Sequence, residues 1–151
     1  IFQELFNTRI KDYSFDWNNV LNFEGETGPY VQYSAARANS ILEKNDFYLK
    51  LDNIDISKVS NYKMNIDELS LIKSIYKFED ILLDSAKKYE PSILARYITE
   101  VAKLFNKFYN SCPISNQEDS VKEFRLILTY CTRLLIEIGL GLLGMDTPKK
   151  M

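Results

Sequence analysis

Tyr30, Tyr33 and Arg37 are the residues of this sequence whose types and spacing point most directly to chemistry. Gly28 is a permissive N-cap and Pro29 suits the first helical position, so a helix is predicted to begin there. At about 100° per residue, the two tyrosines and the arginine share one side of that helix. Aromatic rings stack on unpaired bases, and a guanidinium holds a phosphate or a base edge, so this side is a candidate nucleotide contact. The same spacing is also typical of a half-buried helix rim without a ligand.

The other side of this helix is predicted to pack against the rest of the protein. It carries small and aliphatic residues at helical spacing, namely Val31, Ala35, Ala38 and Leu42. The helix is predicted to end near Lys44, because Asn45 can adopt a left-handed C-terminal conformation. Residues 46–65 lack a sustained period and predict an ordered connector with a short strand-like or helical piece.

Three more helices are predicted along the chain. The first runs to about Tyr89 from an N-cap at Asn65 or Asp67, with Glu68 in capping-box position relative to Asn65, and the second starts at Pro91. The third follows an N-cap at Ser115 with Glu118 in capping-box position and ends before Gly144. Their predicted buried stripes are Leu71, Ile75, Phe78, Leu82 and Tyr89; then Leu94, Ile98, Val101, Phe105 and Phe108; then Val121, Phe124, Leu128, Cys131, Leu135, Ile138 and Leu142.

Several single residues carry further expectations. Gly139 and Gly141 each cost about 1 kcal/mol of helix propensity, which indicates a close backbone approach, with the C-terminal tail as one candidate. Residues 1–8 predict a short helix. In the segment that follows this helix, Trp17 is predicted to be buried, and Val20, Leu21 and Phe23 are predicted to point inward. The chain begins at Ile1 without a methionine, on an already amphipathic run, so we expect a fragment of a longer protein.

The composition restricts where a nucleic acid could bind. The formal net charge is −2 and the isoelectric point is near 5.3, so any such contact must be local. The stretch from Lys87 to Lys107 has five basic and two acidic residues, a net +3 that could face phosphates. The absence of histidine argues against a zinc site, and the two cysteines are expected to be reduced thiols, as in the cytoplasm. No signal peptide or membrane-spanning run of about 18 residues appears.

Two stretches resemble a known family. Residues 15–37 have the sequence FDWNNVLNFEGETGPYVQYSAAR, and the chain ends Leu143-Gly144-Met145-Asp146-Thr147-Pro148-Lys149-Lys150-Met151. Both are similar to arginyl-tRNA synthetases, in which the first leads into a C-terminal anticodon-binding domain and the second closes its last helix. The resemblance covers essentially the whole chain.

The resemblance implies an all-α fold, the anticodon-binding helical bundle of class I aminoacyl-tRNA synthetases. Four main helices over residues 29–151 are expected, plus N-terminal helical pieces, with residues 1–28 as the C-terminal end of the connection from the catalytic domain. It implies an anticodon pocket formed by Tyr30, Tyr33, Arg37 and Met151, with Met151 helping to enclose the middle anticodon cytosine. Gln32 and Asn39 flank this face and are expected to be solvent or helix-cap partners.

The parent enzyme implied is arginine-tRNA ligase, which uses ATP to join L-arginine to tRNA(Arg), releasing AMP and diphosphate. Because the sequence has no histidine, it cannot contain a HIGH-type ATP site, so we expect no catalytic residue, metal site or cofactor in this chain. ATP, with Mg, and L-arginine are expected in the missing catalytic domain. We expect a cytoplasmic monomer that binds tRNA(Arg) and neither DNA nor a membrane.

Two alternatives remain at this point. The chain could be a helical protein-interaction module without RNA binding, in which the exposed aromatic rings meet a partner helix. It could also be the related anticodon domain of another class I synthetase, such as the cysteine enzyme, although the GPYVQY string and the terminal Pro-x-x-Met favour arginine.

Overall fold

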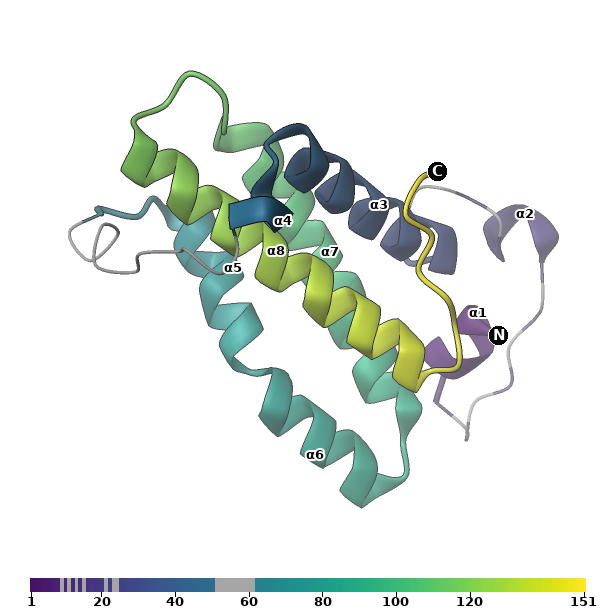
Figure 1. The fold of residues 1–151 in the computed structure, drawn as a ribbon. Coiled ribbons are helices and arrows are strands. Elements are labelled where there is room, and N and C mark those ends of the chain that lie inside the picture. The colour runs from purple at the N-terminus through teal and green to yellow at the C-terminus, as the bar shows by residue number, and fades with distance from the viewer. Residues whose placement is uncertain are drawn as a thin grey trace.

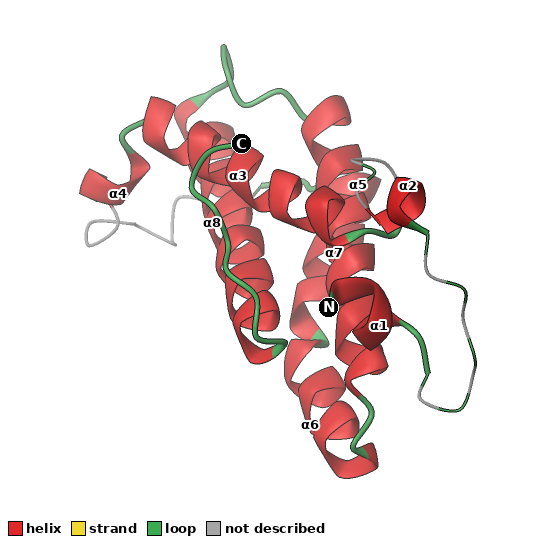
Figure 2. Cartoon of the chain, turned by 90° about the vertical axis from the view of Figure 1, so that its right-hand side faces the viewer, coloured by secondary structure: helices red, strands yellow, loops and turns green. Residues whose placement is uncertain are grey.

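A computed structural model describes residues 1–8, 10, 12, 14, 16–20, 22, 25–50 and 62–151. Every regular element in these ranges is a helix, which confirms the all-α prediction (Figure 2). None of these helices is long and apolar enough to cross a membrane. In chain order they are α1 Phe2–Phe6, α2 Trp17–Val20, α3 Gly28–Lys44, α4 Phe47–Lys50, α5 Ile66–Tyr76, α6 Phe78–Lys88, α7 Pro91–Ser111 and α8 Asp119–Leu142.

Helix α7 is the centre of the packing. It contacts α1, α3, α5, α6 and α8, while α8 also lies along α3 (Figure 1). The prediction for α7 is confirmed, because all five residues of its apolar stripe are almost inaccessible: Leu94, Ile98, Val101, Phe105 and Phe108. A helix enclosed on several sides needs such a continuous stripe, and burial of each large side chain contributes about 1.5–3 kcal/mol.

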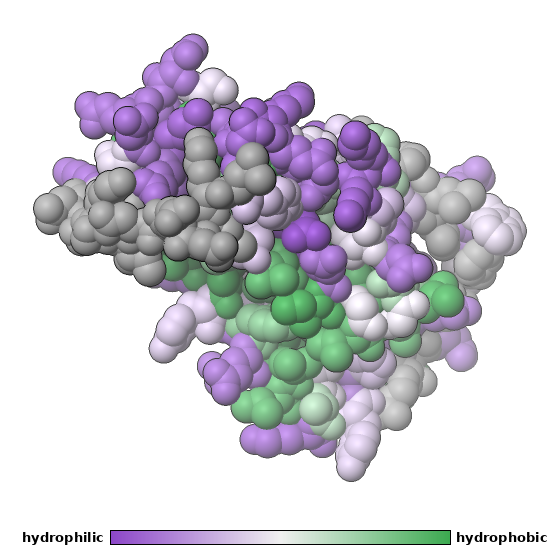
Figure 3. All heavy atoms as spheres, in the orientation of Figure 1, coloured by the Kyte–Doolittle hydropathy of each residue, from purple (hydrophilic) through white to green (hydrophobic). Residues whose placement is uncertain are grey.

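The buried face of α8 is only partly the predicted one. Leu128 and Leu135 are buried, but Ile138 and Leu142 are 42% and 57% exposed. Figure 3 shows hydrophobic residues gathered along the lower half of α8. The buried face includes Thr129 and Thr132 instead, whose hydroxyls donate to backbone carbonyls one turn earlier and so need no other partner.

A close approach of α7 to α8 occurs at Gly139. A Cβ atom there would lie 2.5 Å from Cγ2 of Ile98, so only glycine fits. The neighbour is therefore α7 and not the C-terminal tail. At Gly141 nothing lies within 4 Å of a built Cβ, so the expectation of a close approach is wrong there.

The helix predicted over 66–89 is broken at Lys77 into α5 and α6. Tyr97 of α7 lies at the break. Its hydroxyl donates to the carbonyl oxygen of Ser74 at 2.7 Å, and its ring stacks on that of Phe78 with the ring centroids 6.1 Å apart. Burial raises the pKa of the Tyr97 phenol to about 12. Tyr89, predicted to be buried, is 80% exposed and ends α6 in the left-handed conformation (φ 52°).

The capping box of Asn65 and Glu68 is confirmed and belongs to a buried ion pair. Glu68 is inaccessible to solvent, and its Oε1 lies 2.7 Å from Nε of Arg125 on α8. Arg125 also donates to the hydroxyl of Tyr62 and to the carbonyl oxygen of Pro113. This network ties α5 to α8 and to the loop before α8.

Three local predictions are wrong. Ser115 does not cap α8, which starts at Asp119 after Glu118 without a side-chain cap. The left-handed residue after α3 is Asp46 (φ 51°) and not Asn45, whose φ is −107°. Trp17 is 66% exposed on the four-residue helix α2, which is too short to form a face that buries a large ring.

Some predictions fall outside the described residues. They concern most of the connector, residues 51–61, and the side chains of Val20, Leu21 and Phe23. Within the connector, the described part contains the short helix α4.

Candidate functional site

Helix α3 is the platform of the candidate site. Its N-cap is Thr27 and not Gly28 as predicted, because Oγ1 of Thr27 accepts a hydrogen bond from the backbone N–H of Tyr30 at 3.2 Å. A hydroxyl satisfies an otherwise unpaired N–H of the first turn, which a glycine cannot do. The predicted packing stripe is confirmed, since its four members are at most 1% exposed: Val31, Ala35, Ala38 and Leu42.

Arg37 lies between two phenol rings on the opposite side of α3. Its Cζ is 4.8 Å from the ring centroid of Tyr33 and 5.2 Å from that of Tyr109 on α7. Its guanidinium donates to Oδ1 of Asn106 at 2.8 Å and to the hydroxyl of Tyr33 at 3.2 Å. These contacts fix the plane of the guanidinium, which favours directional contacts to a planar acceptor.

Asn106 of α7 holds Arg37 and two residues of α3 together. Its amide nitrogen donates to the hydroxyls of Tyr30 and Ser34, each at 2.9 Å, while its oxygen accepts from Arg37. Tyr30 is half-buried and packs against the core. The Tyr30 side chain therefore supports the base of the site.

A hollow of about 460 Å³ opens beside Arg37. It brings together three of the four predicted site residues, Tyr33, Arg37 and Met151, and does not include Tyr30. Three of its lining side chains are basic and none is acidic, so the side chains of the hollow favour an anion. Its full lining is Tyr33, Ala36, Arg37, Ser40, Ile41, Lys44, Tyr109, Lys150 and Met151.

Sequence reasoning missed Tyr109, Lys44 and Lys150. Tyr109 is 41% exposed and follows the buried Phe108, so an aromatic residue just off the buried stripe of α7 was the available signal. The two lysines stand near the ends of their segments, where a sequence pattern cannot distinguish a site residue from an ordinary surface charge.

Gln32 and Asn39 hold the C-terminal tail, residues 145–151, on α3. Gln32 Nε2 donates to the carbonyl oxygen of Asp146 at 2.7 Å, and Asn39 Nδ2 to that of Lys149 at 3.3 Å. The expectation that both residues serve solvent or helix caps is therefore wrong. The tail brings Lys150 and Met151 to the hollow (Figure 1).

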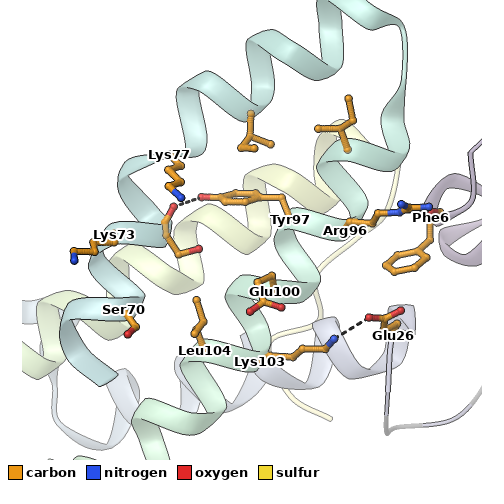
Figure 4. A pocket seen from close by; sticks show the side chains of 13 residues that line it. Phe6, Glu26, Ser70, Lys73, Lys77, Arg96, Tyr97, Glu100, Lys103 and Leu104 are labelled. Carbon is orange, nitrogen blue, oxygen red and sulfur yellow. Dashed lines mark hydrogen bonds and ion pairs between the residues drawn. The ribbon is translucent and has the colours of Figure 1, made fainter. Parts of the chain in front are cut away.

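A larger hollow, about 950 Å³, lies between α7 and the α5–α6 pair (Figure 4). Its charges are mixed and partly satisfied within the protein. Lys103 Nζ lies 2.8 Å from Oε1 of Glu26, and this hydrogen bond raises the pKa of Lys103. The Cζ atom of Arg96 lies 5.4 Å from the ring centroid of Phe6, and the Nε–H of Arg96 donates to the backbone carbonyl oxygen of Phe6.

The predicted basic patch over Lys87–Lys107 is also offset by acids. Lys88 lies 2.8 Å from Asp84, and Lys107 lies 2.9 Å from Asp67. Hydrogen bonds from Lys107 and Ser111 lower the pKa of Asp67. With Lys103 also paired, this stretch presents little uncompensated positive charge, and the hollow beside Arg37 is the better anion site.

Comparison with known proteins identifies the family of this chain. Residues 31–151 match the DALR anticodon binding domain family. The arginine-tRNA ligase of Halothermothrix orenii is 46% identical over 153 residues, and that of Clostridium beijerinckii is 47% identical over 152. In both cases the match covers 100% of this chain and 26% of the relative, so the chain spans about a quarter of their length.

Solved structures show the same fold. The arginyl-tRNA synthetase of Thermus thermophilus superposes with a TM-score of 0.79 at 32% identity, covering 93% of this chain and 24% of that one. The Plasmodium falciparum enzyme gives 0.81 at 29%, covering 99% and 26%. The resemblance inferred from residues 15–37 and from the C-terminal end is thereby confirmed, and this chain belongs to the DALR anticodon binding domain family.

Proposed function

We propose that this chain binds the anticodon loop of tRNA(Arg) as part of an arginine-tRNA ligase. The observation that carries the proposal is the hollow in which Tyr33 and Arg37 of α3 meet Tyr109 and Met151, two residues that are distant from them in sequence. The family match and the arginine-tRNA ligase relatives support it. A chain of net charge −2 needs a local cationic site to bind RNA, and this hollow is one.

The geometry suggests how one unpaired base would be held. The exposed ring of Tyr33, or that of Tyr109, offers a stacking surface, and stacking contributes about 1–3 kcal/mol per base. Arg37 is already oriented by Asn106 and can donate to a base edge without first ordering its side chain. The flexible thioether of Met151 closes the hollow, while Tyr30 contributes from beneath, through Asn106.

The remaining parts of the reaction are assigned to the parent protein. Residues 1–28 form the C-terminal end of the connection from its catalytic domain, and residues 29–151 form the anticodon-binding bundle. Among the described residues, no three His, Cys, Asp or Glu side chains come together to hold a metal ion. We assign ATP with Mg, L-arginine and the joining chemistry to the catalytic domain of the parent protein, which we propose to be a monomeric cytoplasmic enzyme that does not bind DNA.

A protein-interaction module without RNA binding is not favoured. Such a module needs an apolar groove, whereas this hollow is rimmed by Lys44, Lys150 and Arg37. The cysteine enzyme is not favoured either, since the relatives named above are arginine-tRNA ligases.

A titration with a fluorescent anticodon stem-loop of tRNA(Arg) tests the proposal. Affinity should fall as salt is added, because phosphate contacts release counterions, and a loop with a changed anticodon should bind more weakly. Tyr33→Ala should weaken binding about 5- to 150-fold, the equivalent of about 1–3 kcal/mol of stacking. Tyr76→Ala is the matched control, since Tyr76 is 87% exposed on α5 and does not line the hollow. Equal affinity for both loops would refute anticodon recognition.

A further inference from the structure

We propose that Asn39 and Gln32 are positioning residues that align the C-terminal tail on α3, so that Met151 forms a wall of the base-binding hollow. This inference rests on the proposed function, but it concerns residues that do not line the hollow themselves. It assigns a role in RNA recognition to two amide side chains on the tail-facing side of α3.

The tail starts from a turn that reverses the chain. Gly144, with φ at +75°, follows α8, and the backbone N–H of Met145 donates to the carbonyl oxygen of Leu140 at 2.9 Å. The N–H of Gly144 donates to the carbonyl oxygen of Gly141 at 3.0 Å, which completes a Schellman motif. The chain is thereby sent back along the bundle toward α3 (Figures 1 and 2).

The spacing of the two amides matches the spacing of the carbonyls that they hold. Gln32 and Asn39 are seven residues apart, which places them on one side of α3 and about 10.5 Å apart along its axis. Asp146 and Lys149 are three residues apart, and three residues of extended chain span about 10 Å. The two hydrogen bonds therefore fix the register of the tail on the helix as well as its position.

Asn39 is the more rigid of the two anchors. It is 4% exposed, and its Oδ1 accepts a hydrogen bond from the hydroxyl of Tyr48 at 2.8 Å. Its Nδ2 donates to Oε1 of Glu43 at 2.9 Å and to the carbonyl oxygen of Lys149. Because the oxygen faces a phenol and the nitrogen faces two acceptors, the amide has one favourable orientation, and that orientation points a donor at the tail.

The hydrogen bond from Asn39 to Lys149 limits how far Met151 can move from the hollow. From Lys149 to Met151 is two residues, or about 7 Å of extended chain. Without that contact the nearest anchor is Asp146, five residues away, which permits a reach of about 17 Å. A side chain held within the shorter range stays at the hollow, whereas one released over the longer range spends most of its time elsewhere and closes the site less often.

The experiment uses the 151-residue chain labelled with ¹³C at the methionine methyl groups. Its three methionines report on different places, since Met151 lies at the hollow, Met145 at the start of the tail and Met64 before α5. In Asn39→Ala the Met151 methyl signal should narrow and move toward its position in an unfolded chain, while that of Met64 stays in place. Affinity for the anticodon stem-loop should fall about 3- to 10-fold, the fold-change expected for losing one hydrogen bond.

Two further variants make the result decisive. Gln32→Leu removes a donor on a half-buried side chain, so the fold should persist even if Asn39→Ala is unstable, and the signals of Met145 and Met151 should shift. Tyr76→Phe is the control, because it removes a phenol hydroxyl from a side chain that is 87% exposed on α5 and does not line the hollow, so its affinity and Met151 signal should stay near those of the wild type.

Each outcome supports or overturns a distinct claim. Weaker RNA binding with an unmoved Met151 signal would show that Asn39 acts otherwise than through the tail. A moved signal with unchanged affinity would show that the tail is no part of the site. If the unmodified chain binds no stem-loop at any salt concentration, the proposed function fails, and the methyl signals still decide whether the two amides hold the tail.

Discussion

Substituting Asn106 with alanine should damage stability and RNA binding together. This one amide links Arg37, Tyr30 and Ser34 through hydrogen bonds of 2.8–2.9 Å. Ser34 is fully buried, and in the variant its hydroxyl keeps only the bond that it donates to the carbonyl oxygen of Tyr30. Arg37, on the solvent-facing side of α3, and Ser34, on its buried side, therefore depend on the same residue of α7.

The expected magnitude follows from these three bonds. A hydrogen bond to a charged group contributes about 1.5–3 kcal/mol and a neutral one about 1 kcal/mol. Arg37 and Tyr30 are partly accessible, so water replaces part of what they lose. We therefore expect the free energy of unfolding to fall by about 2–3 kcal/mol. The loosened Arg37 should weaken binding of the stem-loop by about 1 kcal/mol, or roughly fivefold.

Urea unfolding and stem-loop titration of Asn106→Ala measure the two effects. The control is Asn110→Ala, one turn further along α7, where the side chain is exposed. It carries the same gain in helix propensity, a few tenths of a kcal/mol, without the three bonds. A difference in stability below about 1 kcal/mol between the variants would refute the account of Asn106 as a link, since even one neutral bond is worth that much.

Three further outcomes concern the bundle itself. Gly139→Ala should destabilise the protein by about 1–3 kcal/mol, because the added methyl group overpacks against α7. Gly141→Ala should stabilise it by up to about 1 kcal/mol, because a Cβ atom there meets open space. Urea unfolding midpoints that shift equally in the two variants would contradict both expectations. The pKa of Tyr97 is about 12 in the folded state against about 10 unfolded, so its contribution to stability is complete below pH 10 and is lost as the pH rises toward 12. The free energy of unfolding of the wild type, relative to that of Tyr97→Phe, should therefore fall by about 2–3 kcal/mol over this range. A relative free energy that does not change with pH would contradict this. Arg125→Met should cost about 3–5 kcal/mol at neutral pH, because Glu68 is left buried without its cation; a loss under 1 kcal/mol by thermal or urea unfolding would show that the pair matters little.

Helical periodicity predicted the fold well where one side of a helix is buried by apolar residues alone. It was correct for α7 and for the packing side of α3. It was inaccurate for α8, because Thr129 and Thr132 satisfy their own hydroxyls and pack as small apolar groups, a possibility that a hydrophobic pattern does not register. It also missed the break at Lys77, where Tyr97 of another helix contacts the chain through a hydrogen bond to Ser74 that no local pattern registers.

The candidate site was only partly visible in the sequence. Tyr33 and Arg37 follow from the spacing on one helix, and Met151 followed from family resemblance. The sequence marks Tyr109 as an aromatic residue off the buried stripe, but its proximity to α3, and that of the tail, could not be predicted, because they depend on how α7 crosses α3 and on the turn at Gly144. The assignment of these residues to RNA binding remains a prediction.

The order in which the pieces of the hollow are synthesised has a consequence during translation. Asn39 and Lys149, which are hydrogen-bonded in the folded protein, are separated by 110 residues. The ribosome therefore synthesises α3, α7 and α8 before the segment that completes the hollow. The hollow therefore gains Lys150 and Met151 after α3 and α7, the two helices that supply the rest of its lining, have been synthesised.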